Sequence, residues 1–474
     1  MRTSVSHWVY TLLALMAIAL GNAASAANVS LWVSNHGTDS NGCGSPTNPC
    51  RSISQAIENA TDGDTIWVGP GHYGNVNGDV GFTGPGDEHP MPTVPDFAGL
   101  FEGTGCIVCI NKAVHVYSTS GAAATVIDSG SLPPYNATVM VTADGAAFGY
   151  VGRGFTITGG NAIGVALYMD SWQGSKLGVV IAGNVDLKDS TGFEVYGPTG
   201  YYHLNCPPDI PQACPGFGGV FWLYQNQASH NGTGFWIRSR NAFSLPSTHK
   251  SVQFLIQNNV TRAAGTGFHI ESGQICGDCT PLGPASEVLT IHNFATNGGV
   301  GFYLRQAGPA KDNFASDNSQ YGFLSVGSSG PFVHNSAIGN AGPGIVTGLD
   351  AGTPSFGLSL QQNNFFNNDR NRPVLSLGEY GPPYDYDPGP SAHCGVLNMG
   401  AVWQSYALDR GSHLPPAPPV PSVTLQATNN YWGSSSGPSS AGAGDAAGGV
   451  CDQNNAVTIT KPFATTAVTI TALP

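Results

Sequence analysis

The sequence has 474 residues, of which 41% are hydrophobic, 9% are charged and 65 are glycine. Disordered chains are rich in charge and poor in apolar side chains, so this composition excludes extensive disorder. The scarcity of charge also argues against a helical bundle, whose exposed faces need Lys and Glu. A net charge of −13 at pH 7 excludes the basic surface expected of a nucleic-acid-binding protein.

Residues 1–26 have the pattern of a secretory signal peptide. Arg2 is followed by an apolar run from about Val9 to Leu20, and Ala24-Ser25-Ala26 provides the small residues of a cleavage site. The run is about 12 residues long, too short to cross a bilayer, and no later apolar stretch reaches ~18 residues. We therefore predict a protein secreted to the periplasm or the cell exterior, without membrane insertion.

Ten cysteines agree with export, because an even number in an exported chain indicates disulfides. Eight of them lie close together in sequence, which favours local pairs, and two remain: Cys43 and Cys50, Cys106 and Cys109, Cys206 and Cys214, Cys276 and Cys279, then Cys394 and Cys451. The two Cys-x-x-Cys runs also allow a zinc or redox site. Disulfides are favoured, since a redox pair normally opens a helix and Gly277-Asp278 lies in a Gly/Pro-rich stretch.

The middle of the chain is a repeat built on glycine followed by an apolar residue. The pair recurs at positions 154, 192, 234, 267, 301, 322 and 344, so the shortest units are 21 or 22 residues long. Alternating apolar stretches such as Val252–Ile256 recur as well, each followed by an Asn. These Asn residues stand 8 or 9 positions before the glycine: Asn184, Asn226, Asn259, Asn293, Asn313 and Asn335.

This repeat predicts an all-β fold, because short alternating strands in units of this length are typical of a parallel β-solenoid. Successive coils of a solenoid stack about 4.8 Å apart, with apolar side chains in inward-facing rows. The repeated Asn residues are expected to form a structural ladder of amides at one turn. The Leu pattern of a leucine-rich repeat is missing.

Insertions enter the coil at one turn. The distance from the Gly-apolar strand to the next Asn is 11 residues in the shortest coil, but 33, 24 and 25 residues in three successive coils between Phe193 and Asn293. The largest insertion spans residues 378–421. Insertions on one side of a solenoid usually build the walls of its binding face.

Two outward rows of side chains are predicted beside these walls. Each strand has the pattern Gly, apolar, x, apolar, x, so both x side chains point away from the core. We predict that one row contains Glu194, Trp236, His269 and Tyr303, and that the other contains Tyr196, Arg238, Glu271 and Arg305. Two interpretations stay open: a binding face, or surface packing with an Arg–Glu–Arg charge ladder across the strands.

Three parts of the chain resemble right-handed parallel β-helix proteins of the pectin-lyase-like superfamily. The first runs from Leu31 through Gly63-Asp64-Thr65-Ile66-Trp67-Val68 to Tyr73, the second is the repeat, and the third is Asn429-Asn430-Tyr431-Trp432-Gly433 with Gly437-Pro438. The resemblance implies a single β-helix domain over residues 27–474. It also implies a cap region at 27–75, where a short helix plugs the coil, and a closing region at 423–474.

The resemblance implies a polysaccharide partner, and the two rows suit one that contains uronic acids. Arginine forks pair with carboxylates, aromatic faces suit the C–H surface of sugars, and histidine is the usual acid or base near neutral pH. We expect substrate binding by Glu194, Tyr196, Trp236 and Tyr303, and catalysis by Arg238, His269, Glu271 and Arg305. A non-catalytic adhesive or envelope module remains the alternative.

If the protein is an enzyme, lyase or C5-epimerase chemistry fits these residues better than glycoside hydrolysis. Hydrolysis needs two carboxyl groups about 5–9.5 Å apart, whereas Glu194 and Glu271 are two coils apart, roughly 9.6 Å along the axis alone. No cofactor is required. The acidic residues Asp369, Glu379, Asp385 and Asp387 offer oxygen ligands for Ca²⁺, but without the spacing of a known calcium motif.

Overall fold

The computed structural model describes the following residues: 28–75, 87–89, 105–130, 137–160, 163–168, 176–196, 218–239, 252–272, 287–305, 307–328, 330–348, 358–369, 394–400, 423–438, 449–453 and 455–470. The predicted signal peptide lies outside them. So do Cys206, Cys214, Cys276 and Cys279, and the residues inserted within the three long coils. No helix in the described ranges has the length and apolar character needed to cross a bilayer.

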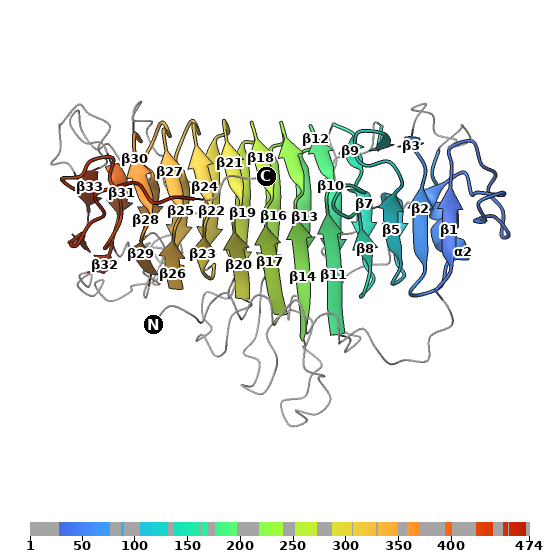
Figure 1. Ribbon diagram of the computed structural model, residues 1–474, viewed down its shortest axis with the longest axis horizontal. Coiled ribbons are helices and arrows are strands. Elements are labelled where there is room, and N and C mark those ends of the chain that lie inside the picture. The colour runs from blue at the N-terminus through green and yellow to red at the C-terminus, as the bar shows by residue number, and fades with distance from the viewer. Residues whose placement is uncertain are drawn as a thin grey trace, which may run out of the picture.

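The chain forms three long parallel sheets that run side by side along one axis (Figure 1). Sheet 1 contains thirteen strands, β1 (Ser30–Val33), β2 (Thr65–Val68), β5 (His115–Ser118), β8 (Ala147–Phe148), β11 (Lys176–Ala182), β14 (Gly218–Tyr224), β17 (Val252–Gln257), β20 (Glu287–Ile291), β23 (Ala310–Lys311), β26 (Gly330–Val333), β29 (Leu358–Gln361), β32 (Thr424–Gln426) and β34 (Val457–Ile459).

Sheet 2 contains eleven strands, β4 (Cys106–Ile110), β7 (Ala137–Val141), β10 (Ile163–Tyr168), β13 (Thr191–Tyr196), β16 (Thr233–Ser239), β19 (Thr266–Ser272), β22 (Val300–Arg305), β25 (Phe323–Val326), β28 (Ile345–Thr347), β31 (Cys394–Asn398) and β33 (Gly449–Asp452). Sheet 3 contains ten, β3 (Gly71–Gly74), β6 (Thr125–Asp128), β9 (Thr156–Thr158), β12 (Val185–Leu187), β15 (Gln227–Ser229), β18 (Val260–Arg262), β21 (Phe294–Thr296), β24 (Phe314–Ser316), β27 (Ser336–Ile338) and β30 (Asn364–Phe366).

Most coils contribute one strand to each sheet, and the pairings between coils are parallel; for example, β13 pairs with β16 and β16 with β19. The fold is therefore the right-handed parallel β-helix that the repeat and the resemblance predicted. One strand was not foreseen, because β31 lies inside the predicted insertion at 378–421 and pairs with β28 and β33. Residues 394–398 thus belong to the coil.

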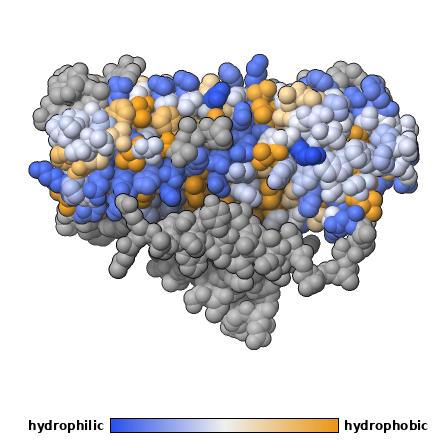
Figure 2. Space-filling model, in the orientation of Figure 1, coloured by the Kyte–Doolittle hydropathy of each residue, from blue (hydrophilic) through white to orange (hydrophobic). Residues whose placement is uncertain are grey.

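The core is a continuous apolar column inside the coil. Its most regular part is a stack of phenylalanines in sheet 2, whose neighbouring rings lie 4.7–4.9 Å apart with interplanar angles of 7–13°: Phe193, Phe235, Phe268, Phe302 and Phe323. Nearly parallel rings at the coil spacing fill the interior without gaps. The face of the molecule seen in Figure 2 in contrast mixes hydrophilic residues with hydrophobic ones.

The predicted asparagine ladder is confirmed. Each buried amide oxygen accepts the backbone N–H of the Asn one coil earlier, at 2.7–3.1 Å, along the series Asn184, Asn226, Asn259, Asn293, Asn313, Asn335, Asn363 and Asn430. A second, shorter ladder was not foreseen; it lies five residues further along the chain and joins Asn318, Asn340 and Asn368. These ladders satisfy polar groups that the turns would otherwise leave buried and unpaired.

The repeated glycines allow adjacent coils to approach closely at the corner before sheet 2. A Cβ atom on Gly301 would lie 2.4 Å from the carbonyl oxygen of Gly322, and one on Gly234 would lie 2.7 Å from that of Gly267. Real Cβ atoms do not come so near to backbone oxygen, and the backbone of the next coil cannot move without breaking its ladder. The glycine of the repeat is therefore required by close backbone approach.

The N-terminal end is closed by the expected helix, α2 (Ile53–Asn59). Ser52 caps it by accepting the backbone N–H of Gln55 at 3.1 Å. Its apolar face, made by Ile53, Ala56, Ile57 and Ala60, is at most 3% exposed. The helix therefore covers the open end of the apolar column.

Three of the predicted disulfides are present, Cys43–Cys50, Cys106–Cys109 and Cys394–Cys451. The last joins β31 to β33, which are neighbours in sheet 2 but 57 residues apart in sequence. In the closing region, Asn430 continues the asparagine ladder and Trp432 is fully buried, with its ring 5.8 Å from that of Phe365. The disulfides agree with an oxidising compartment.

Candidate functional site

The two predicted rows lie in register on the outer face of sheet 2. Parallel pairing aligns Glu194, Trp236, His269 and Tyr303 on β13, β16, β19 and β22, and it aligns Tyr196, Arg238, Glu271 and Arg305 beside them. The alternate side chains, from Phe193 to Leu304, are buried in the core as expected. The pleat of these strands therefore positions eight polar or aromatic side chains on one patch, called here the sheet 2 patch.

His269 lies between two aromatic rings of the first row. Its ring centroid is 5.4 Å from that of Trp236, in a stacked arrangement, and 4.4 Å from that of Tyr303. Its Nε2 atom lies 2.7 Å from Oε1 of Glu271, two residues along the same strand. Both side chains are largely shielded from solvent, with 12% exposure for His269 and 6% for Glu271. The carboxylate and the two rings therefore hold the imidazole in one orientation.

Arg238 occupies the other half of the patch. Its guanidinium carbon lies 3.3 Å from the ring centroid of Trp236, and one terminal nitrogen lies 3.9 Å from Oε1 of Glu194. Burial raises the pKa of Glu194, and the nearby charge of Arg238 opposes that rise. Trp236 Nε1 and Arg238 Nε are buried donors without an acceptor among the described residues. A buried donor usually has a hydrogen-bond partner, so these two N–H groups are available to a polar ligand.

The patch ends at both sides in apolar residues of the same row. Beyond Glu194 the row continues with Ala166 and Met140, and beyond Tyr303 it continues with Leu324 and Val346. All four of these flanking side chains are at most 3% exposed. The polar part of the outer face is therefore limited to the four strands β13, β16, β19 and β22.

The roles assigned to the eight residues from sequence remain predictions, although their geometry is now defined. Trp236, His269, Tyr303, Glu271, Arg238 and Glu194 form one connected set of contacts. Arg305 on β22 aligns with Glu271 on β19, one coil earlier. Tyr196 packs edge-on against Tyr168, with their ring centroids 6.2 Å apart. Tyr168 was not foreseen, because the repeat was assigned to Gly154, which precedes β9 of sheet 3, whereas Gly164 is the glycine in strand β10 of sheet 2.

Two acidic residues inside the coil were also missed by sequence reasoning. Asp186 is fully buried in β12, at a position that is apolar in the neighbouring coil, and it accepts a hydrogen bond from Nδ2 of Asn231. Asp189 accepts the backbone N–H of Gly160 at 2.8 Å. Burial raises the pKa of both groups, to about 6 for Asp189, and the neighbouring carboxyl group raises that of Asp186 further. They face the interior and are not part of the sheet 2 patch.

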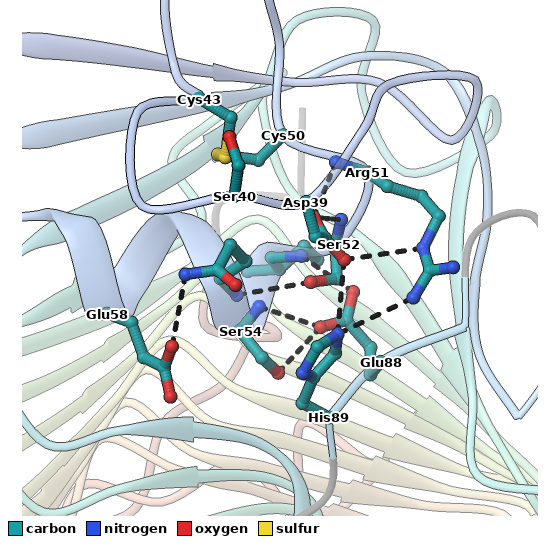
Figure 3. Close-up of polar contacts among 12 residues, drawn as sticks. Asp39, Ser40, Cys43, Cys50, Arg51, Ser52, Ser54, Glu58, Glu88 and His89 are labelled. Atoms are coloured by element: carbon teal, nitrogen blue, oxygen red, sulfur yellow. Dashed lines mark hydrogen bonds and ion pairs between the residues drawn. A yellow bond between two sulfur atoms is a disulfide. The ribbon is translucent and has the colours of Figure 1, made fainter. Parts of the chain in front are cut away.

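A third polar cluster fixes residues 87–89 to the N-terminal cap (Figure 3). Glu88 is fully buried and accepts the backbone N–H groups of Ile53 and Ser54 at 2.8 and 2.7 Å. His89 Nε2 lies 3.1 Å from Oδ2 of Asp39. Burial raises the pKa of Glu88 to about 7 despite these hydrogen bonds. The cluster closes the cap and has no connection to the sheet 2 patch.

No group of three or more His, Cys, Asp or Glu side chains arranged to hold a metal ion occurs in the described ranges. Of the residues proposed for Ca²⁺, Asp369 is buried and its carboxylate accepts the backbone N–H of Cys394 at 3.0 Å. Glu379, Asp385 and Asp387 lie outside the described residues. Asp369 therefore has a structural partner, and the calcium expectation is untested.

Comparison with known proteins finds similarity only to solved structures, at low sequence identity. No family model matches the chain, and no curated protein matches it either. Among solved structures, it is similar to pectate lyase Pel9A with 16% identity and a TM-score of 0.33, covering 73% of this chain and 76% of that one.

The chain is also similar to a rhamnogalacturonan lyase, with 14% identity, a TM-score of 0.32 and coverage of 85% and 87% of the two chains. A third similar structure is the A-module of the Azotobacter vinelandii mannuronan C-5 epimerase AlgE4, with 11% identity, a TM-score of 0.34 and coverage of 85% and 91%. Because one fold hosts many activities, the roles of residues in this chain rest on its own geometry.

Proposed function

We propose that this protein is a secreted β-helix protein that binds an acidic polysaccharide on the sheet 2 patch and cleaves it by β-elimination. The observation that carries the proposal is the contact between His269 and Glu271 at 2.7 Å, flanked by the rings of Trp236 and Tyr303. A histidine oriented by a carboxylate is the usual arrangement of a general base. The Tyr303 ring suits the C–H face of a sugar residue, whereas the Trp236 ring already stacks on His269 and Arg238.

The proposed chemistry needs three groups. An arginine, Arg238 or Arg305, pairs with the uronate carboxylate and stabilises the negative charge that develops beside C5. His269 takes the proton from C5 through the ring nitrogen that does not face Glu271. The C4–O bond then breaks, a C4–C5 double bond forms, and the leaving oxygen takes a proton from the Tyr303 hydroxyl. A C5-epimerase would share the first step and return a proton to the opposite face.

The test is the absorbance of the unsaturated uronate product in the near ultraviolet. We expect alginate, pectate or a glycosaminoglycan to give a rising signal, and His269→Ala to reduce the rate by about 10²–10⁴-fold, the usual contribution of a general base. Arg262→Ala is a matched control, because Arg262 is exposed on sheet 3. A flat signal on every substrate, together with unchanged C5 configuration, would exclude both enzyme activities.

A non-catalytic adhesive or envelope module is the second candidate, and one observation favours it. Arg238 stacks on Trp236 and approaches Glu194, so its guanidinium has partners within the protein. Cross-strand pairs of this kind stabilise a sheet by themselves. The double variant Arg238→Ala/Arg305→Ala distinguishes the two candidates from simple surface packing: polysaccharide binding that survives it unchanged would mean that the sheet 2 patch is not the site.

A further inference from the structure

A second row of aromatic side chains lies on the outer face of sheet 1, at the N-terminal end of the coil. Trp32, Trp67 and Tyr117 occupy aligned positions on β1, β2 and β5. Tyr150, in the turn after β8, extends the row by one coil. Neighbouring ring centroids are 6.4, 5.7 and 6.2 Å apart along the row. These four residues, called here the aromatic ledge, lie on a different sheet from the sheet 2 patch.

The rings of the ledge do not pack on one another as the core phenylalanines do. Their interplanar angles are 33°, 54° and 63°, compared with 7–13° in the phenylalanine stack. Trp32, Trp67 and Tyr117 are half-buried, so part of each side chain remains accessible. The Tyr150 side chain is 57% exposed, among the largest values for an apolar or aromatic residue in the described part of the chain. The ledge is therefore an accessible surface.

Among the described residues, aromatic side chains follow one another in successive coils of this row only at this end, although Tyr224 of β14 contacts Trp222 of its own strand at 4.9 Å. From β11 onwards, the same outer row of sheet 1 contains the following residues: Ala182, Tyr224, Gln257, Ile291, Lys311 and Val333. A solenoid that needed aromatic stacking to hold its outer face together would repeat it in every coil. The concentration of four aromatic residues in four successive coils indicates a local purpose.

A positively charged side chain, Arg153, lies against the aromatic ledge. The guanidinium carbon of Arg153 lies 4.9 Å from the ring centroid of Trp67. Arg153 is exposed and forms no ion pair with any residue in the described ranges. His115 lies beside the row, with its ring 5.9 Å from that of Tyr117, and burial lowers its pKa, so it adds no charge at neutral pH. Arg153 is thus the charged donor available to a ligand on the ledge.

We propose that the aromatic ledge is a second polysaccharide-binding site, which holds a chain along the coil axis. Pyranose rings present a flat face of C–H groups, and Trp and Tyr faces carry the partial negative charge that attracts such groups. Tilted rings at coil spacing offer successive stacking places to successive sugars. Arg153 pairs with a uronate carboxylate or with ring hydroxyl groups beside Trp67. The ledge requires no catalysis on the sheet 2 patch, so either proposal can fail without the other.

The experiment is native affinity electrophoresis of the full oxidised protein in gels that contain alginate, polygalacturonate or a neutral β-glucan. We expect Tyr150→Ala and Trp67→Ala each to weaken binding by about 3- to 10-fold, which corresponds to the usual value of one aromatic contact. Arg153→Ala is expected to reduce binding of the two acidic polymers more than that of the glucan. Val151→Ser is the matched control, because Val151 is 43% exposed and lies outside the row.

The variants also separate the two sites. Binding by the ledge must persist in Arg238→Ala/Arg305→Ala, which removes charges from the sheet 2 patch only. Unchanged binding in both Tyr150→Ala and Arg153→Ala would overturn the proposal, and so would complete loss of binding in the sheet 2 double variant. Tyr150 and Arg153 are exposed, so these variants keep the test decisive even if Trp67→Ala fails to fold.

Discussion

Removal of one rung of the asparagine ladder tests what holds adjacent coils together. The Asn293 side chain accepts hydrogen bonds from the backbone N–H and Nδ2 of Asn259 at 3.0 and 3.1 Å, and it donates to Ile256 O and Asn313 Oδ1 at 2.7 and 3.0 Å. Asn293→Ala leaves the buried N–H of Asn259 without an acceptor, which costs about 1–3 kcal/mol, and it removes other bonds worth about 0.5–1.5 kcal/mol each. We expect a loss of about 3–5 kcal/mol.

The assay is urea unfolding followed by circular dichroism, with Asn111→Ala as the control, because Asn111 is exposed. In a solenoid, each coil contacts only its neighbours, so damage at one coil weakens both adjoining interfaces. The unfolding midpoint of Asn293→Ala should therefore fall clearly below that of the control. A free energy of unfolding within ~1 kcal/mol of the control would refute the reasoning, because it would mean that the orphaned N–H finds another partner.

Three further predictions concern packing, pH and covalent closure. Gly301→Ala places a Cβ 2.4 Å from backbone oxygen and should lower thermal stability by about 1–3 kcal/mol, whereas Gly178→Ala, with nothing within 4 Å, should not. Burial raises the pKa of Glu88 from 4.5 to about 7, so the contribution of Glu88 to stability is full below pH 4.5 and is lost as the pH rises through 7. The free energy of unfolding should fall by about 3 kcal/mol over this range. Glu88→Gln should abolish this pH dependence in denaturation curves measured from pH 4 to 8. Cys394→Ser/Cys451→Ser removes a disulfide between residues 57 apart in sequence and should reduce the free energy of unfolding by about 4 kcal/mol. Adding a reductant to this variant should not cause the loss of stability that breaking this disulfide causes in the unmodified protein.

The register of the sheet 2 patch could be predicted because it follows from a short local rule. Glycine marks the corner, and strict alternation after it assigns each side chain to one face. One error in register would have moved His269 into the core, yet Phe268 and Ile270 are buried and His269 is not. The same local rule predicted the asparagine ladder, since a fixed spacing from the glycine places each amide at the same turn.

The contacts within the patch could not be predicted in the same way. The sequence left open a charge ladder from Arg238 through Glu271 to Arg305, and these three residues are aligned across the strands. It did not predict that Arg238 also stacks on Trp236 of its own strand and approaches Glu194 of the coil before. Glu271 contacts His269. Each long side chain has several partners within reach, and the choice depends on the rotamers and burial of all of them together.

Other features were missed because they join residues that no local pattern connects. Glu88 closes the cap by binding the start of a helix 34 residues earlier in the chain. Asp186 breaks the apolar alternation of its strand, and only the position of Asn231 in the next coil explains how a buried carboxyl group is accommodated there. The aromatic ledge likewise depends on coils of unequal length aligning Trp67 with Tyr117.

The sequence by itself determined the coil, its inward and outward faces and its longer asparagine ladder, because periodic glycine, asparagine and apolar residues act through neighbouring coils alone. The tertiary structure decided which polar side chains meet, which carboxyl groups are buried and where aromatic faces stay open. Those outcomes depend on the distances between residues of several coils and on how far packing buries each side chain away from water. Such quantities exist only once the coils are stacked.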